Sequence, residues 1–385
     1  TLRVQPGDTL KIQLINRLPA SPAGQSALSY LNNQNATNLH FHGLHVDPRE
    51  IRPGVFGDYV VDTPLAGVMP GQVRQHEVAI PATHTSGIFW YHPHLHGQAA
   101  NQLFAGLYGA IIVEDDGAVE ANRERVLVIS DIDFDDNGRI LQPGMMALMM
   151  GREGERILVN GQETPEFETE IGALERWRIV NACSSRYLHL HFAGAQMRVL
   201  GLDAQPHPKP VDTDELILAP GNRADVLAQL GTEPVYITFD SIVHPDTMTA
   251  PTVGRIIASF KPTGATADKV AGLIAPLTAL PSLAEAKLAA KRKFTLAMPD
   301  MMSGMGAMHG SGNMGGMNHS MATETDGTFG LGHSDVPYNA YLVNGKRPQN
   351  PEVFAAKPGE RIRLRVINAG SDTAFQFALQ LVFDA

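Results

Sequence analysis

The sequence has little cysteine, little positive charge and no long hydrophobic run. Cys183 is the one cysteine among 385 residues, so the chain forms no internal disulfide and contains no Cys-x-x-Cys pair typical of a zinc ribbon. Lys and Arg number 30 against 40 Asp and Glu, and the formal net charge of −10 argues against nucleic acid as a partner. No stretch approaches the roughly 18 apolar residues that a membrane-spanning helix needs.

Turn-forming residues, by contrast, are abundant. The 37 glycines and 26 prolines, with 18% charged and 6% aromatic residues, indicate an ordered, turn-rich, all-β protein. A length of 385 residues predicts two or three domains rather than one. The chain begins without Met at T-L-R-V-Q-P-G-D, already inside a strand pattern, so we expect a truncated N-terminus whose leader segment is missing.

One strand pattern occurs three times. A glycine turn is followed by an alternating apolar and polar run that closes on Asn, at 1–16, 166–181 and 352–368. Such alternation is typical of a half-buried strand, and repeats spaced this widely do not form a solenoid. We therefore predict tandem β-sandwich domains. The predicted parts are a first domain at 1–118, a second domain at 119–262, a linker at 263–336 and the start of a third, incomplete domain at 337–385.

Histidines gather in two short motifs of the first predicted domain. N-L-H-F-H-G-L-H (38–45) and G-I-F-W-Y-H-P-H-L-H-G (87–97) contain six of the 15 histidines of the chain. Positions i and i+2 of a strand point to the same side, so each motif places imidazoles on one face. A single pair is equally well explained by solvated polar positions. Two pairs facing each other would offer four nitrogens, and neutral imidazole is the commonest metal ligand in proteins, so the two motifs predict a metal site.

A tract rich in methionine lies within the predicted linker. Residues 298–321 carry eight of the 15 methionines among Gly, Ser and Asn, a composition that builds no buried core. Two interpretations stay open. The tract is either a low-complexity linker or a copper-collecting segment, since thioethers are soft ligands that select Cu(I). The residues that would bind Cu(I) are Met301, Met302, Met305, Met308, His309, Met314, Met317, His319 and Met321.

These motifs resemble those of the multicopper oxidases, in particular the bacterial laccase-like and cuprous oxidase group. The similarity runs from residue 1 to about residue 262 and resumes less closely after 337. It implies cupredoxin-like Greek-key β-sandwiches that carry a mononuclear type 1 copper and a trinuclear cluster of type 2 and type 3 copper. The matching stretches are N-L-H-F-H-G-L-H (38–45), G-I-F-W-Y-H-P-H-L-H-G-Q (87–98), G-L-Y-G-A-I-I-V-E-D (106–115), R-W-R-I-V-N-A (176–182) and L-I-L-A-P-G-N-R-A-D-V-L (216–227).

The resemblance also implies ligands and a reaction. The implied ligands are His40 for type 2 copper and His42, His92 and His94 for the type 3 pair, with His45 and His96 outside the ligand positions. The implied reaction is one-electron oxidation of Cu(I) or a phenolic donor, coupled to four-electron reduction of O₂ to water. The methionine tract favours Cu(I) as donor and a role in copper tolerance, and the family implies a periplasmic or secreted location.

The sequence departs from the family in its C-terminal part. The family's remaining cluster ligands and type 1 site lie in a His-Pro-x-His-x-His stretch and a later His-Cys-His, and neither occurs here. We therefore expect a fragment of a longer oxidase, without a type 1 site, and keep open a non-catalytic copper carrier. Cys183 is interpreted as a buried core residue, and His189 and His191 as structural. Asp58 and Asp62 follow the first motif and could help deliver protons to reduced oxygen, but acidic loop residues are usually solvated, and the interpretation as solvated loop residues is preferred.

Overall fold

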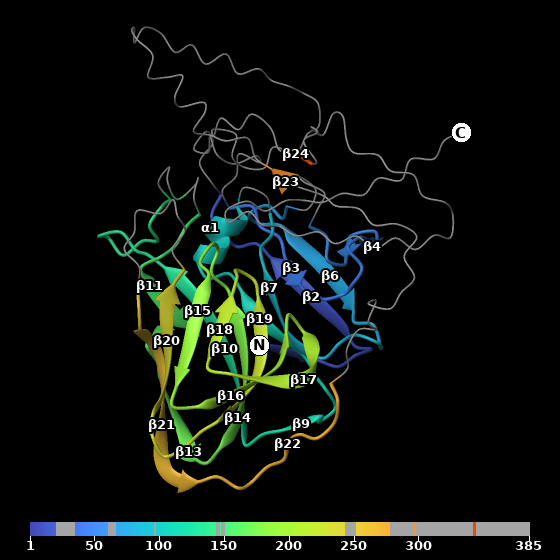
Figure 1. Cartoon of the computed structure of the whole chain (residues 1–385). Coiled ribbons are helices and arrows are strands. Elements are labelled where there is room, and N and C mark those ends of the chain that lie inside the picture. The colour runs from blue at the N-terminus through green and yellow to red at the C-terminus, as the bar shows by residue number, and fades with distance from the viewer. Residues whose placement is uncertain are drawn as a thin grey trace. The chain divides into compact units, whose positions relative to one another are not determined.

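The computed structural model describes residues 1–20, 35–60, 67–95, 98–143, 147, 151–242, 252–277, 296–297 and 342–343. The chain divides into two units, Thr1–Pro281 and Ser282–Ala385, and nearly all described elements belong to the first (Figure 1). These elements are strands apart from one short helix, α1 (Ala99–Phe104), so the all-β prediction is confirmed. None of the described helical residues forms a helix long and apolar enough to cross a membrane.

The first sandwich packs two four-stranded sheets, with the orders β1-β8-β7-β3 and β2-β6-β5-β4. Phe41, Phe89 and Ile111 from one sheet are buried against Val78 from the other. The apolar residues of β2 alternate with polar ones, and every second side chain is partly buried, as a strand with one face on a core requires. The strands are β1 (Leu2–Val4), β2 (Thr9–Ile15), β3 (His40–His42), β4 (Glu50–Arg52), β5 (Val55–Phe56), β6 (Val73–Ala79), β7 (Gly87–His92) and β8 (Gly109–Val113).

The second sandwich packs a seven-stranded sheet, β12-β11-β10-β14-β19-β16-β17, on a five-stranded sheet, β13-β21-β20-β15-β18. Trp177 of the first sheet stacks on Phe260 of the second, with ring centroids 4.2 Å apart. The strands are β10 (Arg123–Ile132), β11 (Arg156–Val159), β12 (Gln162–Glu163), β13 (Glu166–Ile171), β14 (Leu174–Asn181), β15 (Leu188–Ala193), β16 (Gln196–Leu202), β17 (Gln205–Thr213), β18 (Glu215–Leu218), β19 (Arg223–Gln229), β20 (Val235–Ser241) and β21 (Arg255–Thr266).

The first two copies of the repeated pattern have the same local structure. Each is a strand, a glycine turn and a second strand, with a φ of +97° at Gly7 and +77° at Gly172, a region that glycine occupies without strain. The closing residues, Asn16 and Asn181, are buried, and each side-chain amide donates to two backbone carbonyls of neighbouring segments. The closing Asn therefore fixes the loops at the end of each strand.

Most of the predicted linker and third domain lies outside the described residues. Of these parts the structure describes 263–277, where β22 (Gly272–Leu273) pairs with β9 (Val119–Glu120), and the pair β23 (Leu296–Ala297) and β24 (Leu342–Val343). The domain boundaries stay predictions. Also outside the described residues are the Cu(I) candidates Met301, Met302, Met305, Met308, His309, Met314, Met317, His319 and Met321.

The two sandwiches share an apolar interface within the first unit. Ile88 and Trp90 of β7, with Ile112 of β8, pack against Val180 of β14 in one buried cluster. Figure 1 shows β7 running beside β19. Burying these side chains from water holds the end of β7, where the second histidine motif lies, against the second sandwich.

Candidate metal centre

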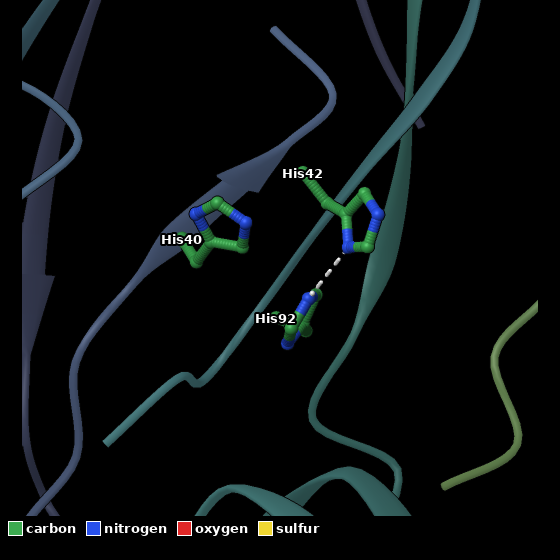
Figure 2. Close-up of side chains that lie close together, drawn as sticks. All are labelled: His40, His42 and His92. Carbon is green, nitrogen blue, oxygen red and sulfur yellow. Dashed lines mark hydrogen bonds between the residues drawn. The ribbon is translucent and has the colours of Figure 1, made fainter. Parts of the chain in front are cut away.

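The histidines of the two motifs lie on adjacent antiparallel strands. In the register of β3 with β7, His40 is opposite His92 and His42 is opposite Trp90. Cross-strand partners project to the same face of a sheet, so these three imidazoles and the indole share one face, whereas Phe41 and Tyr91 between them share the other. Figure 2 shows His40, His42 and His92 turned toward one another.

All four histidines that the resemblance implies as ligands lie in one cluster. Ring centroids are 5.5 Å apart for His40 and His42, 5.2 Å for His40 and His92, and 5.0 Å for His40 and His94. The Nδ1 atom of His42 is 3.1 Å from the Nε2 atom of His92. One ligating atom from each of His40, His42 and His92 lies within 4.8 Å of the others, which is close enough for a shared metal ion or cluster.

Neighbouring acceptors orient two of the rings. The Nδ1 atom of His92 is 2.8 Å from the carbonyl of Pro93, and because a carbonyl only accepts, this nitrogen carries the proton. The Nε2 atom then presents its lone pair toward His42. The Nδ1 atom of His40 is 2.9 Å and 3.0 Å from the two oxygens of Asp58, which leaves Nε2 of His40 to face the cluster. This is the carboxylate–histidine arrangement that fixes metal ligands.

The environment keeps two imidazoles of the cluster, those of His42 and His92, uncharged. Burial lowers the pKa of His42 to about 2, and the positive charge of Arg223 acts in the same direction. Burial likewise lowers the pKa of His92 to about 3. Both rings are therefore neutral at physiological pH, and neutral imidazole is the form that binds a metal. Clustered imidazole nitrogens suit copper, so the residues present fit the metal that the resemblance implies.

The interpretation of Asp58 as a solvated loop residue is wrong. Its side chain is buried, and besides holding His40 it accepts a 3.0 Å hydrogen bond from the backbone amide of Phe41. Spacing along the chain does not reveal the contact of Asp58 with His40, because the two residues are 18 positions apart in sequence and meet only in the folded structure. Asp62, the other acid interpreted in this way, lies outside the described residues.

The second sandwich also contributes to the cluster, which sequence reasoning missed. Gly221 has a φ of +81°, and a Cβ atom there would lie 2.9 Å from Cε1 of His42. Glycine therefore lets this loop approach the ring closely. Arg223 donates to the backbone carbonyls of Ile88 on β7 and of Gly221, and so joins this loop of the second sandwich to the first sandwich. The one hint in the sequence is A-P-G-N-R (219–223), which contains both residues.

Among the described residues, His45, Cys183 and His189 have their own surroundings. His45 donates its backbone amide to Nε2 of the buried His84 at 2.9 Å, a structural contact. His96 lies outside the described residues. Cys183 is 1% exposed in the core of the second sandwich, which confirms its interpretation as a core residue. His189 lies on β15, in the other sandwich.

We expect Asp58→Asn to weaken metal binding at the cluster by about 10–100-fold, the usual cost of removing an outer carboxylate partner of a ligating histidine. The amide keeps one acceptor for His40 but loses the charge. The measurement is competition for copper with a chromophoric chelator. Asp47→Asn is the matched control, because the side chain of Asp47 in the same sandwich is 38% exposed and pairs with Arg49 rather than with a histidine. Equal affinity in both variants would contradict the orienting role of Asp58.

Comparison with known proteins finds relatives along both sandwiches. A family model described as Multicopper oxidase matches residues 1–118, and another with the same description matches residues 130–260 and 317–380. "Multicopper oxidase mco" of Staphylococcus aureus is 25% identical over 236 residues, which are 60% of this chain and 46% of that protein. "Cell division protein FtsP" of Salmonella typhimurium is 30% identical over 161 residues, which are 39% of this chain and 33% of that protein. The chain thus spans less than half the length of either relative.

Solved structures show the same relationship in three dimensions. The structure titled "Multicopper oxidase from Campylobacter jejuni: a metallo-oxidase" is 26% identical to this chain, with a TM-score of 0.59. The match covers 80% of this chain and 59% of that one. This similarity confirms the expected cupredoxin-like β-sandwich fold.

Proposed function

The chain belongs to the multicopper oxidase family, and we propose that its histidine cluster holds copper for the reduction of dioxygen by electrons from a reducing substrate. The observation that supports this most is the convergence of His40, His42 and His92 on one face of two paired strands, with the ring of His94 just after β7 and 5.0 Å from that of His40. Copper suits the reaction because it cycles between two oxidation states, whereas zinc does not.

The protein's own residues prepare the site before any metal binds. His40 would hold type 2 copper, and His42, His92 and His94 the type 3 pair, as the resemblance implies. The Pro93 carbonyl fixes the tautomer of His92, so its lone pair needs no rearrangement. Burial keeps the rings of His42 and His92 neutral. Bound copper would pass electrons from the reducing substrate to O₂, which takes up four electrons and four protons to give two waters.

The proposed donors are Cu(I) and phenolic compounds, and the proposed role is copper tolerance in the periplasm or outside the cell. Support comes from the methionine tract at 298–321, whose thioethers suit Cu(I). We expect deletion of this tract to lower Cu(I) oxidation several-fold more than phenol oxidation, because only the first donor needs soft ligands. Oxygen uptake with each donor measures the two rates. Equal losses on both substrates would contradict the donor assignment.

A second candidate is a copper-binding carrier without oxidase activity. Two observations favour it. Cys183, the one cysteine in this sequence, is buried in a core and so offers no thiolate to a copper ion, and one relative is named for cell division rather than for oxidation. Copper content, an absorption spectrum and oxygen uptake of the copper-loaded chain separate the two. Oxygen uptake driven by Cu(I) or a phenol supports the oxidase. Stoichiometric copper with no uptake, and with no intense blue band of a thiolate–copper site, supports the carrier.

A further inference from the structure

A second histidine pair lies on the outer face of the second sandwich. Along β15 the side chains of Leu188, Leu190 and Phe192 are buried in the core. The alternate positions, His189 and His191, therefore project from the opposite face of the strand, and their ring centroids are 4.3 Å apart.

Carboxylates from both neighbouring strands meet this pair. In the sheet register Glu215 of β18 is opposite His191, and Asp240 of β20 is opposite His189, so all four side chains share one face. An Oε2 atom of Glu215 lies 2.8 Å from Nε2 of His189 and 3.8 Å from Nδ1 of His191. On the far side of the second ring, Asp240 Oδ2 is 3.2 Å from Nε2 of His191.

We propose that His189, His191 and Glu215 form a surface site for a divalent late transition-metal ion, zinc(II) or copper(II), separate from the cluster in the first sandwich. One ligating atom of each residue lies within 4.8 Å of the other two. Three ligands bound at about 2.0–2.2 Å in a tetrahedral arrangement would be roughly 3.3 Å apart, so the observed separations need only small side-chain shifts. Water completes the coordination.

Asp240 acts as the outer partner of this site. It accepts from the His191 nitrogen that faces away from Glu215, which is the carboxylate–histidine arrangement that orients a ligand ring. Its other oxygen accepts a 2.7 Å hydrogen bond from the backbone amide of Gly254. The geometry is thus fixed from outside the ligand set.

The donor chemistry selects the ion. Two imidazole nitrogens and a carboxylate oxygen suit zinc(II) and copper(II), whereas magnesium demands an octahedral shell of oxygens, and Cu(I) prefers thioether or thiolate sulfur. Two carboxylates beside two imidazoles also give the face a negative charge that a divalent cation neutralises. The side chains of His189 and His191 are 25% and 35% exposed, so an ion exchanges directly with solvent.

The test is titration of the full chain with Zn²⁺, and separately with Cu²⁺, in competition with a chromophoric chelator. We expect the double variant His189→Asn/His191→Asn to bind one equivalent less of the ion than the unaltered chain. The cluster around His40 is the same in both proteins, so its metal cancels in the difference. His207→Asn, a change at another histidine of this sandwich, is the matched control and should keep the equivalent. Asp240→Asn should keep the stoichiometry and weaken the affinity about 10–100-fold.

If the histidine double variant fails to fold, Glu215→Gln provides the same test at an exposed position. Loss of the equivalent with either ion supports the site. Equal stoichiometry in all variants with both ions overturns it and leaves the four groups as a surface ion-pair network. Displacement of bound zinc by an equal concentration of Mg²⁺ also overturns it, because a site built on nitrogen ligands discriminates strongly against that ion.

Discussion

Replacing His42 and His92 with alanine is expected to abolish copper binding at the cluster in the first sandwich. The double variant removes two proposed ligands whose facing nitrogens lie 3.1 Å apart. Losing an outer partner alone costs about 10–100-fold in metal affinity, so the loss of two proposed direct ligands should cost more than about 100-fold. The measurement is copper per chain after dialysis against a chelator of known affinity. Oxygen uptake with Cu(I) or a phenol should fall to background in the same samples.

The control for this variant must also disturb a buried histidine. His84 lies in the same sandwich, accepts from the backbone amide of His45, and donates through Nδ1 to the carbonyl of Thr85 at 2.8 Å. His84→Gln breaks at least one of these bonds and should lower the melting temperature without changing copper stoichiometry. Unchanged copper in His42→Ala/His92→Ala, or an equal loss in His84→Gln, would mean that the cluster is a polar packing feature and not a metal site.

The strands that carry the histidine cluster were predictable from sequence, whereas the residues that contact the rings from elsewhere in the fold were not. His40 and His42 are separated by the period of a strand, and the same period acts in the second motif, so local spacing alone puts each pair on one face. The contacts of Asp58 and Gly221 with these rings arise from loops brought together by the fold. Neither contact produces a periodic pattern in the sequence. The position of Asp58 depends on the course of a loop in the first sandwich, and that of Gly221 depends on how the two sandwiches pack.

In the fold as well, local sequence patterns predict where strands lie but not how the strands pair. The glycine turns and alternating runs mark β2 and β14, but no alternation specifies that β10 pairs with β14 in parallel, or β1 with β8. Strand β17 contains prolines at alternate positions, which a periodicity analysis would reject, yet it lies at the edge of its sheet, where missing amide donors cost no ladder bond. Strand order depends on tertiary packing, which local patterns do not contain.

Arg178→Met is expected to destabilise the chain by about 3–5 kcal/mol, the usual cost of removing one partner from a buried ion-pair network. Arg178 is fully buried on β14, with its guanidinium 2.7 Å from Glu124 and 3.3 Å from Asp225. Arg176 pairs with the same Asp225 at 2.6 Å and also with Asp115, which follows the last strand of the first sandwich. Removing the Arg178 guanidinium therefore leaves the carboxylates of this network without enough positive charge to balance them. The network lies at the junction of the two sandwiches.

Urea unfolding measures this loss as a fall in the midpoint. Arg198→Met is the matched control: Arg198 also pairs with a carboxylate on a neighbouring strand, Asp212, but both side chains are more than half exposed. Exposed pairs contribute about 0–1 kcal/mol, so the control should unfold near the unaltered chain. Equal midpoints for the two variants would show that the buried network stabilises no more than a surface pair.

Acid should narrow the difference between Arg178→Met and the unaltered chain. Burial alone raises the pKa of Glu124, but the charges of Arg178 and Arg3 outweigh it and hold that pKa below its ordinary value. A carboxyl group with a lowered folded-state pKa stabilises the fold above the unfolded pKa, about 4.3, and loses that contribution as the pH falls through the folded value. Arg178→Met lacks most of the stabilisation that ionised Glu124 gives the unaltered chain. The free energy of unfolding of the variant should therefore fall less between pH 5 and pH 3 than that of the unaltered chain. A difference that stays constant across this range would place the stabilising effect of Arg178 in packing rather than in charge.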